Sequence, residues 1–156
     1  MLTDNDIDPW RYLKRYSIIV GFIIVILNIA IFFFVSKIEK NPPITKTNNE
    51  SCYYAIDSVA VSRFSVEVNG WAFVKGQEAI LHVNSVIIGD ERASYVLPTK
   101  LIARKDVSVM FAVDGKNRDQ SGFFSRGLKP FIPKGKYRVY VNCAGYVIDT
   151  EQDIII

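Results

Sequence analysis

Side chains able to do acid–base or nucleophilic chemistry are scarce in this chain. His82 is the only histidine among 156 residues. It alternates with apolar residues on a predicted strand, where a lone imidazole is more often structural than catalytic. Serines are plentiful, but nucleophilic catalysis needs a nucleophile, a base and an orienting group together. The sequence therefore predicts no catalytic residue and a protein that is not an enzyme.

The spacing of ligand-type residues predicts neither a metal site nor a cofactor site. Two distant cysteines and one histidine are too few for a tetrahedral zinc site. Residues 114–119 place Lys116 and Arg118 where a calcium loop needs oxygen ligands. The nine glycines form neither a P-loop nor a dinucleotide fingerprint. We expect no metal and no cofactor.

One group of side chains suits an anionic partner. Residues 126–138 include five basic residues and no acidic one: Arg126, Lys129, Lys134, Lys136 and Arg138. Such a group can face anionic lipid headgroups or an acidic glycan, although a solvated hairpin with ordinary surface charge explains it as well. Residues 51–156 carry 13 basic and 11 acidic side chains, a balance that argues against a nucleic-acid partner.

The elements that must position these groups begin with an apolar run. Residues 17–36 contain no charge, and only Ser17, Asn28 and Ser36 are polar. At the helical rise the run is about 30 Å long, the thickness of the bilayer hydrocarbon core. This predicts a transmembrane helix. A core helix should show a polar face, and a cleaved signal peptide, the stronger alternative, usually has a shorter apolar region.

Basic residues flank the apolar run on both sides and decide its predicted orientation. Arg11, Lys14 and Arg15 are clustered before it, whereas three lysines are spread over residues 37–46. The compact cluster, with Trp10 and Tyr12 beside it, favours the N-terminal side as the inner side. Residues 1–16 are therefore predicted to be a cytoplasmic tail, and the chain after the run to lie outside.

The only two cysteines, Cys52 and Cys143, lie near the two ends of the remaining chain. A disulfide between them would close a loop of about 90 residues and stabilise the fold by up to about 4.5 kcal/mol in the chain-entropy model. It would persist only in an oxidising compartment. Two buried free thiols are the alternative. We predict the disulfide.

The chain after the apolar run divides into a predicted stalk and one domain. Residues 37–50 contain Pro42 and Pro43 and a polar tail, which is typical of a stalk. Residues 51–156 have the length of one domain. Short alternating stretches separated by turn residues predict seven or eight strands, with one short helix capped by Asp106 and ending near Val113. Without βαβ alternation, this pattern predicts an antiparallel immunoglobulin-like β-sandwich, with a small barrel as the alternative.

Four short motifs occur along this domain: Gly-Trp-Ala at 70–72, Arg-x-Asp-Val at 104–107, Gly-Phe at 122–123 and Gly-x-Tyr-x-Val at 135–139. Together they resemble small β-sandwich modules appended to bacterial proteins of cell-surface glycan biosynthesis. The resemblance implies an accessory role in envelope glycan assembly. The residues themselves favour a core role for Trp71 over a sugar platform, and a structural ion pair between Arg104 and Asp106.

The predicted protein is a single-pass protein of a bacterial cytoplasmic membrane, with an outer domain that binds or scaffolds an envelope glycan or protein. The candidate binding residues are Trp71, Arg126, Lys129, Lys134, Lys136 and Arg138. One alternative is a membrane-tethered immunity or inhibitor protein whose sandwich edge captures a protein partner by strand addition. An enzyme of unfamiliar type is a third class, which would need a cleft with convergent polar groups.

Overall fold

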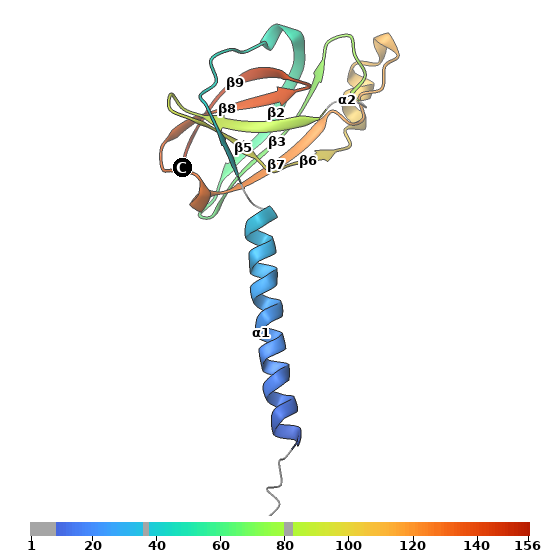
Figure 1. Cartoon of the computed structure of the whole chain (residues 1–156). Helices are drawn as coiled ribbons and strands as arrows, with labels where there is room; N and C mark the ends of the chain where they lie inside the picture. Colours follow the sequence, from blue (N-terminus) through green and yellow to red (C-terminus); the bar gives the residue numbers. More distant parts are fainter. Residues whose placement is uncertain (1–8, 36–37, 80–82) are drawn as a thin grey trace, which may run out of the picture. The chain divides into compact units, whose positions relative to one another are not determined.

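The structure is a computed structural model that describes residues 9–35, 38–79 and 83–156, with side chains described only from Arg15 to Ile31 in the first range. The chain divides into two compact units, Met1–Ser36 and Lys37–Ile156, drawn in Figure 1. His82 lies outside the described residues, so its predicted structural role stays a prediction.

The first unit contains one continuous helix, α1 (Pro9–Val35). From Tyr16 to Ile31 its large apolar side chains are between 50% and 69% exposed, on every side of the helix. The amide of Asn28 donates to the carbonyl of Ile24 at 2.8 Å, so this polar side chain has a partner inside its own helix. In the described part of the chain, no helix is long and apolar enough to qualify as a membrane span. The transmembrane prediction for residues 17–36 is therefore not confirmed.

The second unit is mainly β, with two antiparallel sheets, as predicted. One sheet has the order β1-β5-β4-β8-β9 and the other the order β2-β3-β7-β6. The strands are β1 (Glu39–Asn41), β2 (Cys52–Val61), β3 (Ser65–Val74), β4 (Asn84–Gly89), β5 (Ser94–Leu97), β6 (Thr99–Ile102), β7 (Gly122–Leu128), β8 (Lys136–Cys143) and β9 (Tyr146–Ile155).

Local sequence explains how the chain turns between strands. Ala144 and Gly145, with φ of 51° and 91°, form the two-residue turn between β8 and β9 that the Ala-Gly pair predicts. Pro98 separates β5 from β6, which belong to different sheets. Because proline has no backbone N–H to add to a ladder, it suits the point where the chain changes sheets.

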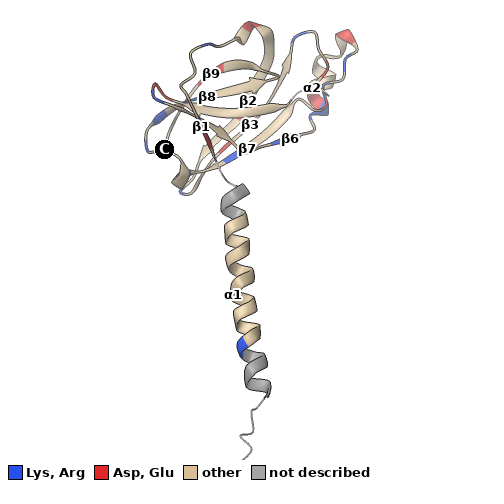
Figure 2. Cartoon of the chain, viewed as in Figure 1, with Lys and Arg blue, Asp and Glu red and all other residues tan. Residues whose placement is uncertain are grey.

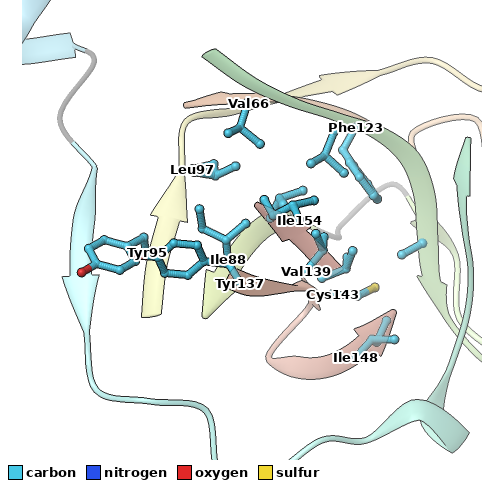
Figure 3. Packing of buried hydrophobic residues seen from close by; sticks show 14 of the residues in the cluster. Val66, Ile88, Tyr95, Leu97, Phe123, Tyr137, Val139, Cys143, Ile148 and Ile154 are labelled. Atoms are coloured by element: carbon cyan, nitrogen blue, oxygen red, sulfur yellow. The ribbon is translucent and has the colours of Figure 1, made fainter. Parts of the chain in front are cut away.

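The core lies between the two sheets and follows the alternation of the strands. Val66 and Val68 of β3, Phe123 of β7 and Val139 and Val141 of β8 are almost fully buried. Figure 3 shows part of this inter-sheet core, with labelled side chains from both sheets meeting one another. Burying one such side chain stabilises the fold by about 1.5–3 kcal/mol before entropy is counted.

The segment predicted as a stalk belongs to the second unit. Strand β1 pairs with β5, with Glu39 opposite Val96 and Asn41 opposite Ser94. The Ser94 hydroxyl donates to the carbonyl of Pro42 at 2.7 Å. The Pro-Pro pair therefore ends a short edge strand instead of beginning an extended linker, and a pairing partner 55 residues away cannot be seen in local composition.

The predicted disulfide is absent from the structure, and this prediction is corrected. Cys52 begins β2 in one sheet and Cys143 ends β8 in the other, and both are buried free thiols. Burial, followed by the neighbouring Cys52, raises the pKa of Cys143 to about 12. The pair fills the core as small apolar side chains do, which is the alternative that the sequence left open.

Candidate functional site

One depression of the β unit, with a volume of about 880 Å³, is here called the polar groove. Three separate stretches line most of it: residues 43–45 after β1, residues 89–92 between β4 and β5, and residues 134–138 before and within β8. Tyr140 and Asp153 complete it from β8 and β9. Ligand sites commonly lie in clefts of this size, so the polar groove is the leading candidate site.

The turn between β4 and β5 fixes the position of Arg92 in the groove. The carboxylate of Asp90 accepts hydrogen bonds from the backbone N–H of Arg92 at 2.9 Å and of Ala93 at 2.8 Å. These bonds lower the pKa of Asp90, because they stabilise its charged form. The turn leaves the Arg92 side chain exposed in the groove wall.

The approach to β8 is fixed by Tyr137. Its hydroxyl donates to the carbonyl of Pro133 at 2.8 Å, and its ring meets that of Tyr95 edge-on at 5.9 Å. Burial raises the pKa of Tyr137, which stays a neutral donor. The hydrogen bond closes residues 133–137 into a rigid corner that holds the exposed Lys134 in the groove.

The basic side chains of the groove fall into a paired set, Lys136 and Arg138, and an unpaired set, Arg92 and Lys134. The Asp153 carboxylate forms ion pairs with Lys136 Nζ and Arg138 Nε, each at 2.8 Å. These contacts lower the pKa of Asp153. Arg92 and Lys134 have no acidic partner within ion-pair distance among the described side chains. These two are the cations that remain free to receive an anionic group.

The five basic residues of segment 126–138, which contains no acidic residue, do not form one surface. Only Lys134, Lys136 and Arg138 line the groove. Arg126 lies on β7 in the other sheet and pairs with Glu67 at 3.2 Å, while Lys129 lies in the 3-10 turn η4 (Lys129–Phe131). Figure 2 shows Lys and Arg interspersed with Asp and Glu over the β unit. Acidic partners come from other strands, so the linear sequence could reveal neither the pairing nor the part of Arg92.

Trp71 is only 7% exposed and lies in a second apolar cluster, as a core role requires. Its parity along β3 places it on the outer face of the four-stranded sheet, opposite Val66 and Val68. Its ring stacks on Phe73 at 5.8 Å and meets Phe111 edge-on at 5.7 Å. We call this cluster, with Ala55, Ala79 and Val107, the outer cluster. Its burial argues against an exposed sugar platform.

Arg118 belongs to the outer cluster and was missed by sequence reasoning. Its side chain is 2% exposed, with the guanidinium 4.7 Å from the Phe73 ring centroid. It donates to the Asp114 carboxylate at 2.7 Å and to the carbonyl of Phe111 at 3.0 Å. The pairing with Asp114 lowers the pKa of that carboxyl to about 2. The i,i+4 spacing of Asp114 and Arg118 was the available signal.

The predicted pairing of Arg104 with Asp106 is present, but the predicted cap is not. Arg104 Nε lies 2.9 Å from Asp106 Oδ1, and the guanidinium also binds Asp57 of β2. The short helix α2 (Lys105–Met110) begins before Asp106, which therefore lies in its first turn, and the helix ends earlier than predicted. A smaller depression of about 360 Å³ lies beside this trio. Its charged groups bind one another, so it is a weaker candidate than the polar groove.

Over the described residues, no group of three or more histidine, cysteine or acidic side chains is placed to hold a metal ion. No family model, no curated protein and no solved structure matches the chain. The resemblance to modules of glycan biosynthesis proteins thus stays a prediction.

Proposed function

We propose that the chain is a membrane-anchored, immunoglobulin-like binding module whose polar groove takes an acidic glycan of the bacterial cell envelope. The observation that carries the proposal is the pair of unpaired cations, Arg92 and Lys134, held in one groove by two separately fixed turns. Guanidinium and ammonium groups are the side chains that bind sugar carboxylates.

The immunoglobulin-like assignment is supported by strand order. The order β2-β3-β7-β6 corresponds to A-B-E-D of that fold, and β5-β4-β8-β9 corresponds to C′-C-F-G, with β1 added beside β5. Tyr137 stands near the start of the strand that corresponds to F, and its hydroxyl donates back to Pro133. This is the arrangement of the tyrosine corner. Such domains bind ligands through loops carried on a rigid sandwich.

The shape and chemistry of the groove support a glycan as the ligand. It is an open depression lined by segments 43–45, 89–92 and 134–138, which leaves room for an extended chain. Tyr140 offers a half-buried ring beside the charged side chains. Sugars bind through hydrogen bonds and aromatic faces, and unpaired cations add selectivity for acidic sugars.

Membrane anchoring through α1 is supported by the sequence around it. The whole run 17–36 has no charge, and it follows the cluster of Arg11, Lys14 and Arg15. The apolar side chains described on α1 are exposed on every side, which in water would be costly. We therefore place the β unit outside the cytoplasm, attached to the bacterial cytoplasmic membrane.

In this proposal the module performs no chemistry, and the acidic side chains support that view. The carboxyls of Asp106, Asp114 and Asp153 all have a pKa lowered by an arginine partner. A carboxylate with a lowered pKa is a poor general base near neutral pH. These groups hold strands and loops together instead of presenting a reactive site.

Isothermal titration of the full chain in lipid nanodiscs tests the proposal. We expect tetragalacturonate to bind and neutral maltotetraose not to bind. Arg92→Ala and Lys134→Ala should each weaken binding by roughly tenfold, because each removes one charge-assisted hydrogen bond. Lys100→Ala is the matched control, since Lys100 is an exposed cation on β6 in the other sheet. Equal binding of both sugars, or equal loss with the control, would reject the acidic-glycan function.

A protein partner is the second candidate, favoured by the free edge of β6. This strand is the last of its sheet, and both Leu101 and Ile102 are more than a third exposed. An extended segment of an inhibited enzyme or toxin can add to such an edge. Leu101→Pro, which removes one backbone donor, would then abolish capture of the partner while leaving the sugar titration unchanged.

A further inference from the structure

One end of the β unit carries exposed aromatic and basic side chains on two adjoining loops. Val61, the last residue of β2, is 41% exposed, and Phe64 in the turn to β3 is 63% exposed. The guanidinium of Arg63 lies 5.2 Å from the Phe64 ring centroid. The neighbouring turn η4 adds Lys129, which is half-buried, and Phe131, which is 36% exposed. We call these five residues the aromatic tip.

The aromatic tip is held in place by hydrogen bonds, so the exposure of Phe64 is imposed by structure. The hydroxyl of Ser62 accepts from the backbone N–H of Phe64 at 3.2 Å and of Ser65 at 2.9 Å. The backbone N–H of Lys129 donates to the carbonyl of Phe64 at 2.9 Å. The two loops are therefore joined, and they present their aromatic and basic side chains at one end of the sandwich.

The charge around the tip is positive. Residues 61–67 and 126–131 contain Arg63, Arg126 and Lys129 but only one acidic residue, Glu67. Arg126 pairs with Glu67 at 3.2 Å, which leaves Arg63 and Lys129 as the excess charge. Exposed phenylalanine with lysine and arginine is the composition of surfaces that lie in the interface of anionic membranes.

The chain joins the β unit beside this end. Gly127 of β7 is flanked by Ile38 and Ile132: a Cβ built on Gly127 would lie 3.4 Å from the Ile38 side chain and 3.5 Å from that of Ile132. Ile132 directly follows η4, and its N–H donates to the carbonyl of Lys129 at 3.0 Å. Ile38 is the first described residue after α1 in the sequence. The aromatic tip and the point where the chain arrives from the proposed anchor thus share one end of the unit.

We propose that the aromatic tip rests on the anionic headgroups of the bilayer that holds α1, with Phe64 and Phe131 entering the interface and Arg63 and Lys129 facing lipid phosphates. This inference rests on the proposed membrane anchoring.

Spin labels on the full chain in vesicles test the contact. Val61→Cys reports on the tip, and Ile24→Cys reports on α1. Glu78→Cys reports on the exposed segment that follows the other end of β3. The native cysteines are buried. Label depth is read from collisions with oxygen and with a water-soluble nickel chelate. In vesicles of equimolar phosphatidylcholine and phosphatidylglycerol, we expect the ratio of oxygen collisions to nickel collisions to be several-fold higher for the Val61 label than for the Glu78 label. The difference should shrink in pure phosphatidylcholine and after Arg63→Glu.

The outcomes separate this inference from the anchoring on which it rests. If the Ile24 label is deep in hydrocarbon and the Val61 label is as accessible to nickel as the Glu78 label, the tip contact is wrong and the anchoring stands. If the Ile24 label is also in water, both are wrong. A Val61 label that is immobile but not enriched in oxygen would mean that protein covers the tip, which also overturns the proposal. Unfolding curves of the labelled variants establish that each is folded.

Discussion

The β unit buries its large side chains in two places that follow different rules. The inter-sheet core is apolar, and the central strands β3, β4 and β8 each contribute alternate residues to it. The outer cluster instead collects Trp71, Phe73 and Phe111 around a buried guanidinium, with Arg118 bound to Asp114 and stacked on Phe73. The first cluster is therefore encoded by local periodicity, whereas the second depends on one ion pair that closes a loop over the sheet.

The largest effect should come from the inter-sheet core. Phe123 is almost fully buried there, so Phe123→Ala should lower the free energy of unfolding by about 3–5 kcal/mol. Urea unfolding of the full chain measures it. Phe64→Ala is the matched control, because Phe64 is exposed and its removal should change stability by about 0.5 kcal/mol or less. Equal losses would mean that burial does not separate the two sites.

Trp71→Ala should lower stability by about 3 kcal/mol, somewhat less than Phe123→Ala, because the outer cluster is bounded by a loop that can relax over the cavity. The same unfolding experiment gives the comparison. A folded Trp71→Ala protein with parental stability and lost sugar binding would instead make Trp71 a recognition residue. That result would remove the distinction between core and site on β3.

The ion pair of the outer cluster should make stability depend on pH in the acid range. The pKa of Asp114 is lowered to about 2 in the folded chain, from an ordinary value of 3.8. A lowered folded-state pKa contributes stability above the unfolded pKa, and this stability is lost as the pH falls from about 4 to about 2. Denaturant midpoints measured at pH 5 and pH 3 should therefore fall less in Asp114→Asn than in the parent. An unchanged pH slope in this variant would contradict the role of the pair.

The thiol pair should have an effect only at alkaline pH. Burial raises the pKa of Cys143 to about 12 from 9.0, so its contribution is present below pH 9 and lost as the pH rises toward 12. In Cys143→Ala, the free energy of unfolding should therefore fall less between pH 9 and pH 12 than it does in the parent. Non-reducing electrophoresis with thiol trapping after unfolding should recover two free thiols per chain. Recovery of none would restore the disulfide that the structure lacks.

The sequence predicted what depends on local pattern and missed what depends on distant partners. Alternation in residues 65–74 and 136–143 predicted the two-sheet fold, and the Ala-Gly pair at 144–145 predicted the last hairpin. The pairing of β1 with β5 was missed, because neither strand shows its partner in its own residues. The five basic residues were predicted as one group, because the acidic side chains that pair with three of them, Glu67 and Asp153, lie on other strands. Arg92 was not predicted as a groove residue for the same reason. It lies in a turn far from Lys134 in the sequence, and only the fold brings the two together.

Hydrogen–deuterium exchange of the full chain with and without tetragalacturonate locates the surface that binds the sugar. The binding proposal predicts slower exchange in residues 89–92 and 134–138, the two fixed turns that carry Arg92 and Lys134. It predicts no change in residues 61–65 or 112–118, at the aromatic tip and the outer cluster, and no change anywhere with maltotetraose. Unchanged exchange in both turns at saturating acidic sugar, or protection centred on β6 or the outer cluster, would contradict the assignment of the polar groove as the binding site.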